Sequence, residues 1–104
     1  MQLPNKVKVG GLVYEVLITP HLSLGENYMG ETQYHELQIR LRPGAPGQME
    51  RTFLHEVIHT LFDNLGYCEH DEKHIDELAG ALYALIADNP QIFGADTKAV
   101  SEKC

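Results

Sequence analysis

The chain has 104 residues and a formal net charge of −7 at pH 7. This length predicts one domain with a single modest hydrophobic core. The acidic balance argues against nucleic acid as a partner, because phosphate contacts need clustered Lys and Arg. We find neither an N-terminal signal segment nor an apolar run of the ~20 residues that cross a membrane. We therefore expect a cytoplasmic protein with no membrane partner.

The first part of the chain is expected to form a small sheet. Residues 7–18 predict a hairpin around Gly10-Gly11, because two glycines supply the positive φ angles of a tight turn. Residues 21–34 are a polar connection with a possible short strand at residues 28–30. Residues 36–42 alternate strictly between apolar and polar side chains, which is typical of a half-buried strand.

Two helices should follow. The first is expected from Gln48 to Leu65, ending at Gly66 in the usual C-cap position. Asp71 is a good N-cap for a second helix that continues to Asp88. The short connection at residues 66–70 makes the helices antiparallel neighbours. The side chains expected to face the core are Leu54, Val57, Ile58, Leu61, Phe62 and Leu65 in the first helix and Ile75, Leu78, Ala79, Leu82, Leu85 and Ile86 in the second.

These elements predict an α+β fold. We expect a small twisted, mainly antiparallel sheet of about three strands packed on two antiparallel helices. The predicted single domain spans residues 1–94, and residues 95–104 are expected to form a flexible C-terminal tail.

The most informative stretch is His55-Glu56-Val57-Ile58-His59, inside the first predicted helix. Residues four apart on a helix lie about 40° apart around its axis, so both imidazoles can bind one Zn²⁺. Glu56 lies about 100° from His55, where it can activate a metal-bound water without coordinating the ion. The pattern predicts a zinc metallopeptidase with one zinc ion per chain.

A catalytic zinc usually has three protein ligands and a water, so the second helix should supply the third ligand. A residue five or six positions into that helix lies level with His59, which selects Asp76 and Glu77. Asp76 is favoured because it lies beside the apolar face around Ile75, whereas Glu77 points to solvent. Glu72 has a compatible azimuth but lies near the helix start, and it ranks behind Glu77.

Other polar side chains are less specific. Cys68 and His70 lie in the connection between the helices and His74 on an exposed helical flank, where ordinary loop and surface roles explain them. A stabiliser of the oxyanion would be a Tyr, His or Arg. The sequence does not choose among four candidates: Tyr34, His35, Tyr67 and Tyr83.

The two helices resemble those of minimal zincins of the gluzincin kind, and more closely the ImmA/IrrE-type metallopeptidases and their small phage and prophage homologues. The resemblance is carried by Phe53–His59 and His74–Leu82 and, with the preceding strand, covers about half of the chain. In that family an acidic ligand precedes a pair of small residues; Ala79-Gly80 places it at Asp76, where the family usually has Glu. The resemblance implies a zinc-dependent endopeptidase inside a bacterial cell, often acting on a regulator such as a phage repressor.

The expected reaction is hydrolysis of a peptide bond in a peptide or protein substrate. His55, His59 and Asp76 would hold the zinc ion. Glu56 would take a proton from the bound water and pass it to the leaving amine. The strand at residues 36–42 is a candidate sheet edge to which the substrate adds as one more strand.

Two alternatives stay open. One is a non-catalytic zincin-like binding module of phage origin that engages a host protein. The other is a structural zinc site closed by four protein ligands, including Cys68 or His70, which would unfold on chelation. The sequence predicts neither the natural substrate nor the oligomeric state.

Overall fold

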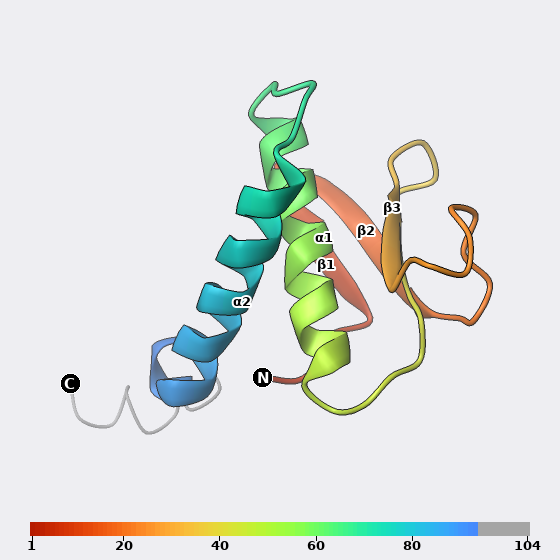
Figure 1. Ribbon diagram of the computed structural model, residues 1–104. Coiled ribbons are helices and arrows are strands. Elements are labelled where there is room, and N and C mark those ends of the chain that lie inside the picture. The colour runs from red at the N-terminus through yellow and green to blue at the C-terminus, as the bar shows by residue number, and fades with distance from the viewer. Residues whose placement is uncertain (94–104) are drawn as a thin grey trace.

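A four-stranded sheet and two helices make up the computed structural model, which describes residues 1–93 (Figure 1). The elements are β1 (Lys6–Val9), β2 (Leu12–Ile18), β3 (Gly30–Gln33), β4 (Gln38–Leu41), α1 (Gln48–Asn64), α2 (Glu72–Asp88) and a short 3₁₀ helix, η1 (Pro90–Phe93). The predicted α+β class is confirmed, with one strand more than expected. The tail predicted at residues 95–104 lies outside the described residues.

The sheet is mixed, with the strand order β1-β2-β4-β3. β1 and β2 form the predicted hairpin, and φ angles of 58° at Gly10 and 86° at Gly11 make its tight turn. β2 pairs with β4 in parallel, whereas β3 pairs with β4 antiparallel. The prediction that residues 36–42 form a sheet edge is therefore wrong, because β4 is an inner strand and the edges are β1 and β3. Alternating side chains report which faces are buried, not which neighbours a strand has.

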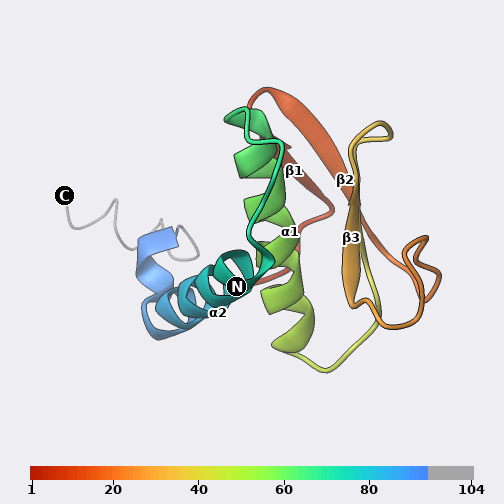
Figure 2. The same ribbon diagram turned by 45° about the horizontal axis from the view of Figure 1, so that its top comes forward.

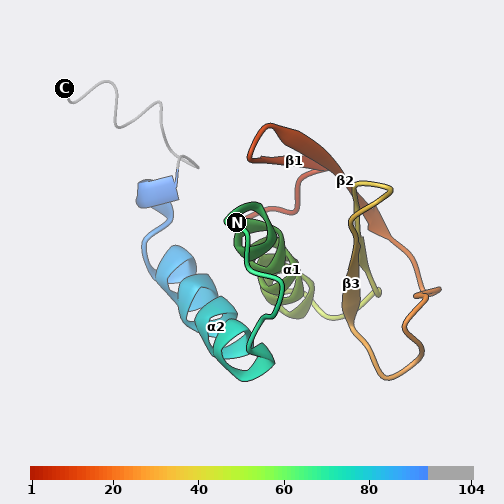
Figure 3. The same cartoon turned by 90° about the horizontal axis from the view of Figure 1, so that it is seen from above.

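α1 lies between the sheet and α2, so the domain has three layers (Figures 2 and 3). One core joins these layers, and its buried apolar members are Val9, Tyr14, Ile39, Leu41, Phe53, Leu54, Ile58, Ile75, Ala79 and Ile86. Because α1 is covered on two sides, it also buries Phe53 and Thr60, outside the predicted stripe. Leu61 and Leu65 of that stripe are exposed, as are Leu78 and Leu85 of the stripe predicted for α2.

β3 packs closely on α1 because Gly30 lacks a side chain. A Cβ atom at Gly30 would lie 2.7 Å from the Thr52 side chain, closer than real contacts allow. Gly30 and Thr32 are two residues apart in the strand, so they face the same side, toward α1. This close approach lets the edge strand reach the middle of α1, where the His-Glu-x-x-His motif lies.

Two charged side chains hold the connection between β2 and β3. Arg42 donates hydrogen bonds to three backbone oxygens of this connection: Pro20 at 2.8 Å, Gly25 at 3.0 Å and Tyr28 at 2.9 Å. The buried Glu31 carboxylate accepts four hydrogen bonds: from Ser23 N at 3.1 Å, Leu24 N at 2.9 Å, Gln33 Nε2 at 3.0 Å and Arg40 Nη1 at 3.3 Å. The loop therefore has a defined shape without secondary structure of its own.

We expect Glu31→Gln to lower the free energy of unfolding by about 2 kcal/mol, because an amide NH₂ would face donors inside the protein. Burial opposes ionisation of Glu31, but its hydrogen bonds together hold the pKa below the ordinary value of 4.5. A depressed folded-state pKa stabilises the fold above about pH 4.5, and this contribution is lost as the pH falls through the folded-state pKa.

Thermal unfolding of both proteins between pH 7 and pH 3 measures this effect. The difference in melting temperature should shrink toward pH 3; a constant difference would contradict the assignment. Glu36→Gln is the matched control, because Glu36 also pairs with Arg40, at 3.0 Å, but is exposed. An exposed pair contributes at most about 1 kcal/mol.

Candidate metal centre

Both motif imidazoles point from α1 toward the first turn of α2. His55 Nε2 lies 3.2 Å from Glu72 Oε1, and His59 Nε2 lies 2.9 Å from Glu72 Oε2. One ligand atom from each residue lies within 4.8 Å of the other two. The His55 and His59 imidazoles are 19% and 13% exposed, so they are mostly buried but still accessible to solvent. Two His and one Glu is a donor set that catalytic zinc sites use, so the residues present fit this ion.

Asp76, the predicted third ligand, lies outside this group. Its Oδ1 atom is 3.4 Å from His55 Nδ1, the ring nitrogen that does not face Glu72. Its Oδ2 atom is 3.4 Å from the Arg51 guanidinium. Glu77, the second choice, is exposed. The structure thus brings His55 and His59 together with Glu72, the residue ranked last by sequence.

The helix geometry explains this difference. The sequence estimate treated the helices as parallel rods, whereas α2 diverges from α1 along its length (Figures 1 and 2). The first turn of α2 therefore carries the acid that reaches both imidazoles, whereas Asp76, one turn further on, reaches only His55. As predicted, Asp71 caps this turn, accepting hydrogen bonds from Lys73 N at 3.1 Å and His74 N at 3.2 Å. The cap fixes the start of α2 and with it the position of Glu72.

Glu56 lies on the opposite flank of the histidines, toward the sheet. It is 7% exposed, and its Oε1 atom accepts a hydrogen bond of 2.7 Å from the Thr32 hydroxyl of β3. Burial raises the pKa of the Glu56 carboxyl above its ordinary value, although the bond from Thr32 and the nearby His55 act against this shift. A raised pKa makes a carboxylate a better proton acceptor near neutral pH.

His70 lies in the connection between the helices and contacts the His59 ring at Nδ1, the nitrogen that does not face Glu72. The two Nδ1 atoms are 2.7 Å apart. Sequence reasoning assigned His70 an ordinary loop role, because linear spacing does not show that the loop folds back. Burial also lowers the pKa of the His59 imidazole, with Glu72 acting in the opposite direction. The neutral form favoured by burial is the one that binds metals.

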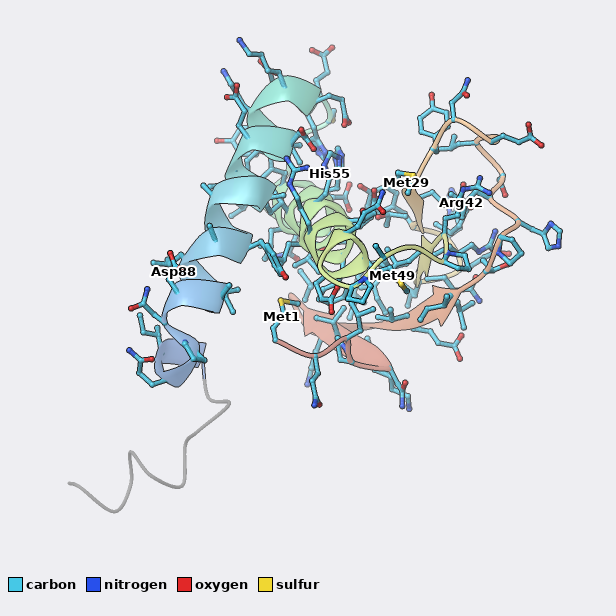
Figure 4. All side chains as sticks on the ribbon, turned by 60° about the horizontal axis from the view of Figure 1, so that its bottom comes forward. Met1, Met29, Arg42, Met49, His55 and Asp88 are labelled. Carbon is cyan, nitrogen blue, oxygen red and sulfur yellow. The ribbon has the colours of Figure 1, made fainter. Side chains whose placement is uncertain are left out.

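A cavity of about 800 Å³ opens in front of this group. α1 and the start of α2 form one wall, and the connection before β3 supplies three exposed apolar side chains opposite: Leu24, Tyr28 and Met29. Figure 4 labels His55 beside the two helices and Met29 toward the sheet. The histidines are therefore reachable from solvent through a cavity that apolar side chains also line.

Tyr34 is the one of the four oxyanion candidates that lines the cavity. Burial and the negative charge of Asp63 raise the pKa of its hydroxyl to about 12. The hydroxyl is therefore protonated at neutral pH and can donate a hydrogen bond. The Tyr83 hydroxyl lies instead beside Gly47, at the start of α1.

The three remaining zinc-capable side chains do not complete a closed site. His74 is exposed and lies 3.3 Å from Asp71. Cys68 is exposed at the cavity rim, and His70 contacts His59 at Nδ1, away from Glu72. Within residues 1–93 the metal-capable group consists of three side chains, which leaves a coordination position for solvent.

No protein-family model matches the chain, and neither the curated proteins nor the solved structures include a match. Within residues 1–93, neither helix is both long and apolar enough to cross a membrane.

Proposed function

We propose that this protein is a zinc-dependent peptidase, acting as an endopeptidase on peptide or protein substrates. The observation that carries the proposal is the convergence of His55, His59 and Glu72 on one point of an open cavity, with the buried Glu56 beside them. Clustered ligands next to a carboxylate of raised pKa are typical of functional sites, which supports the proposal over an ordinary solvated helix face. A cytoplasmic location in a bacterial cell remains part of the proposal.

Each residue of the site has a defined role in this reaction. His55, His59 and Glu72 would hold Zn²⁺, which when bound lowers the pKa of a coordinated water to about 7. Glu56 accepts the proton of the attacking water and delivers it to the leaving amine. Thr32 orients the Glu56 carboxylate through its 2.7 Å hydrogen bond. Tyr34 donates a hydrogen bond to the carbonyl oxygen under attack.

β3 offers the substrate a place to bind. Arg42 N donates to Met29 O at 2.8 Å, so Met29 and Arg42 form a hydrogen-bonded pair. Along an antiparallel pair, residues that hydrogen-bond to the neighbouring strand alternate with residues whose N–H and C=O groups point the other way. The backbone groups of Gly30 and Thr32 therefore point away from β4, to the free edge of the sheet. An extended peptide can pair with this edge, along the cavity wall. The sheet edge that pairs with the substrate is thus proposed at β3, and not at residues 36–42 as the sequence suggested.

Metal content and cleavage of an unstructured protein test the proposal together. We expect about one zinc per chain, cleavage of a reduced and alkylated protein substrate, loss of cleavage with a chelator, and recovery when zinc is restored. Zinc binding without turnover would overturn the peptidase and support the non-catalytic binding module. Unfolding on chelation, together with absence of turnover, would favour a structural zinc site.

A further inference from the structure

The His70 side chain bridges His59 and the backbone of its own loop. Its Nδ1 atom lies 2.7 Å from His59 Nδ1, and its Nε2 atom lies 3.0 Å from the Tyr67 carbonyl oxygen. The ring also packs nearly at right angles to that of Phe62, at 5.7 Å between centroids and 83° between ring planes. These three contacts fix both the position and the orientation of the His70 ring.

The hydrogen bonds also fix where the protons lie. A carbonyl oxygen can only accept, so His70 Nε2 carries the hydrogen that points at Tyr67. A neutral imidazole has one N–H group, which makes His70 Nδ1 an acceptor. With a neutral His70, the hydrogen between the two histidines comes from His59 Nδ1.

This assignment makes Nε2 the His59 atom that faces Glu72. It lies 2.9 Å from Glu72 Oε2, which can only accept, so the contact needs a hydrogen or a metal ion between the two atoms. Two acceptors that face each other repel, and a cation bound by both relieves the repulsion. The tautomer that His70 imposes is thus the one that a metal at this position requires.

We infer that His70 is a positioning residue that holds His59 in its metal-binding tautomer. The inference rests on the proposed zinc site, but His70 itself is not a ligand, because both of its ring nitrogens are occupied by hydrogen bonds. Partners that hold a metal-binding imidazole in this way typically change metal affinity by about 10–100-fold.

Zinc affinity, measured by competition with a chromophoric chelator, tests the inference. We expect His70→Ala to weaken zinc binding by about 10–100-fold. His70→Gln should recover part of the loss, because its amide oxygen can accept the hydrogen of His59 Nδ1. His74→Gln is the matched control and should leave the affinity unchanged, because His74 is exposed and lies against Asp71 instead. Zinc affinity of His70→Ala equal to that of the wild type would overturn the inference.

The ¹⁵N NMR shifts of the His59 ring nitrogens give a second readout on the metal-free wild type at one fixed pH. We expect Nδ1 to carry a hydrogen; an unprotonated Nδ1 would overturn the inference even if His70→Ala fails to fold. The same measurements distinguish failure of the proposed peptidase from failure of the inference about His70. A wild type with the expected tautomer but no affinity for zinc would refute the peptidase, whereas zinc binding that is indifferent to His70→Ala and His70→Gln would refute only the role of His70.

Discussion

Glu56→Gln should reduce the kcat of peptide cleavage by about 10³-fold while zinc content stays at the wild-type level. The amide cannot accept a proton, but it has the same shape as the carboxyl, and its oxygen can still accept the hydrogen bond from Thr32. Because Glu56 faces β3 whereas the metal ligands face α2, the substitution removes proton transfer without removing a ligand. Steady-state cleavage kinetics and metal analysis on the same sample measure both quantities.

Glu69→Gln is the control for this substitution, because Glu69 is an exposed acid in the nearby interhelical connection. It should leave both cleavage and zinc content unchanged. Cleavage by Glu56→Gln at more than about a tenth of the wild-type rate would exclude Glu56 as the general base. Loss of zinc from Glu56→Gln would instead place its carboxylate on the metal.

The second large effect concerns the third ligand. We expect Glu72→Gln to weaken zinc binding by more than about 100-fold. This exceeds the loss of about 10–100-fold that is typical when a residue that hydrogen-bonds a metal ligand, without binding the metal itself, is removed. Asp76→Asn should weaken zinc binding less, by about tenfold, the lower end of the range for a partner of a ligand, because Asp76 lies 3.4 Å from His55 Nδ1 and outside the metal-capable group. Titration of both variants with zinc against a competing chelator compares them directly.

The two variants serve as controls for each other, since both replace an exposed acid of α2 by its amide. Circular dichroism would show that α2 is intact in both. A larger loss of affinity in Asp76→Asn than in Glu72→Gln would assign the third ligand to Asp76, as the sequence alone suggested. Equal, small losses would mean that neither acid binds the metal and would remove the basis of the proposed site.

Local features of the sequence were predictable because they depend on neighbouring residues. The glycine pair of the hairpin, the Asp71 cap and the helix that carries His55 and His59 all follow from turn geometry, side-chain capping and periodicity. Each of these signals acts over only a few residues. The structure agrees with all of them.

The parts of the site that join distant segments were not predictable in the same way. Selecting Glu72 over Asp76 requires the divergence of the helices, which no periodicity encodes. The contact of His70 with His59 depends on how the connecting loop folds back. The hydrogen bond from Thr32 to Glu56 depends on the strand order and on Gly30, whose missing side chain admits β3 to the surface of α1.

The shortness of β3 limits what such an enzyme would cut. The strand has four residues, and only Gly30 and Thr32 turn their backbone groups outward. A target must therefore present a stretch of chain whose own N–H and C=O groups are unpaired, such as a terminus, a loop or a locally opened segment. Folded proteins would resist attack in proportion to the free energy of that opening, so the stability of the target, more than its sequence, would decide its lifetime.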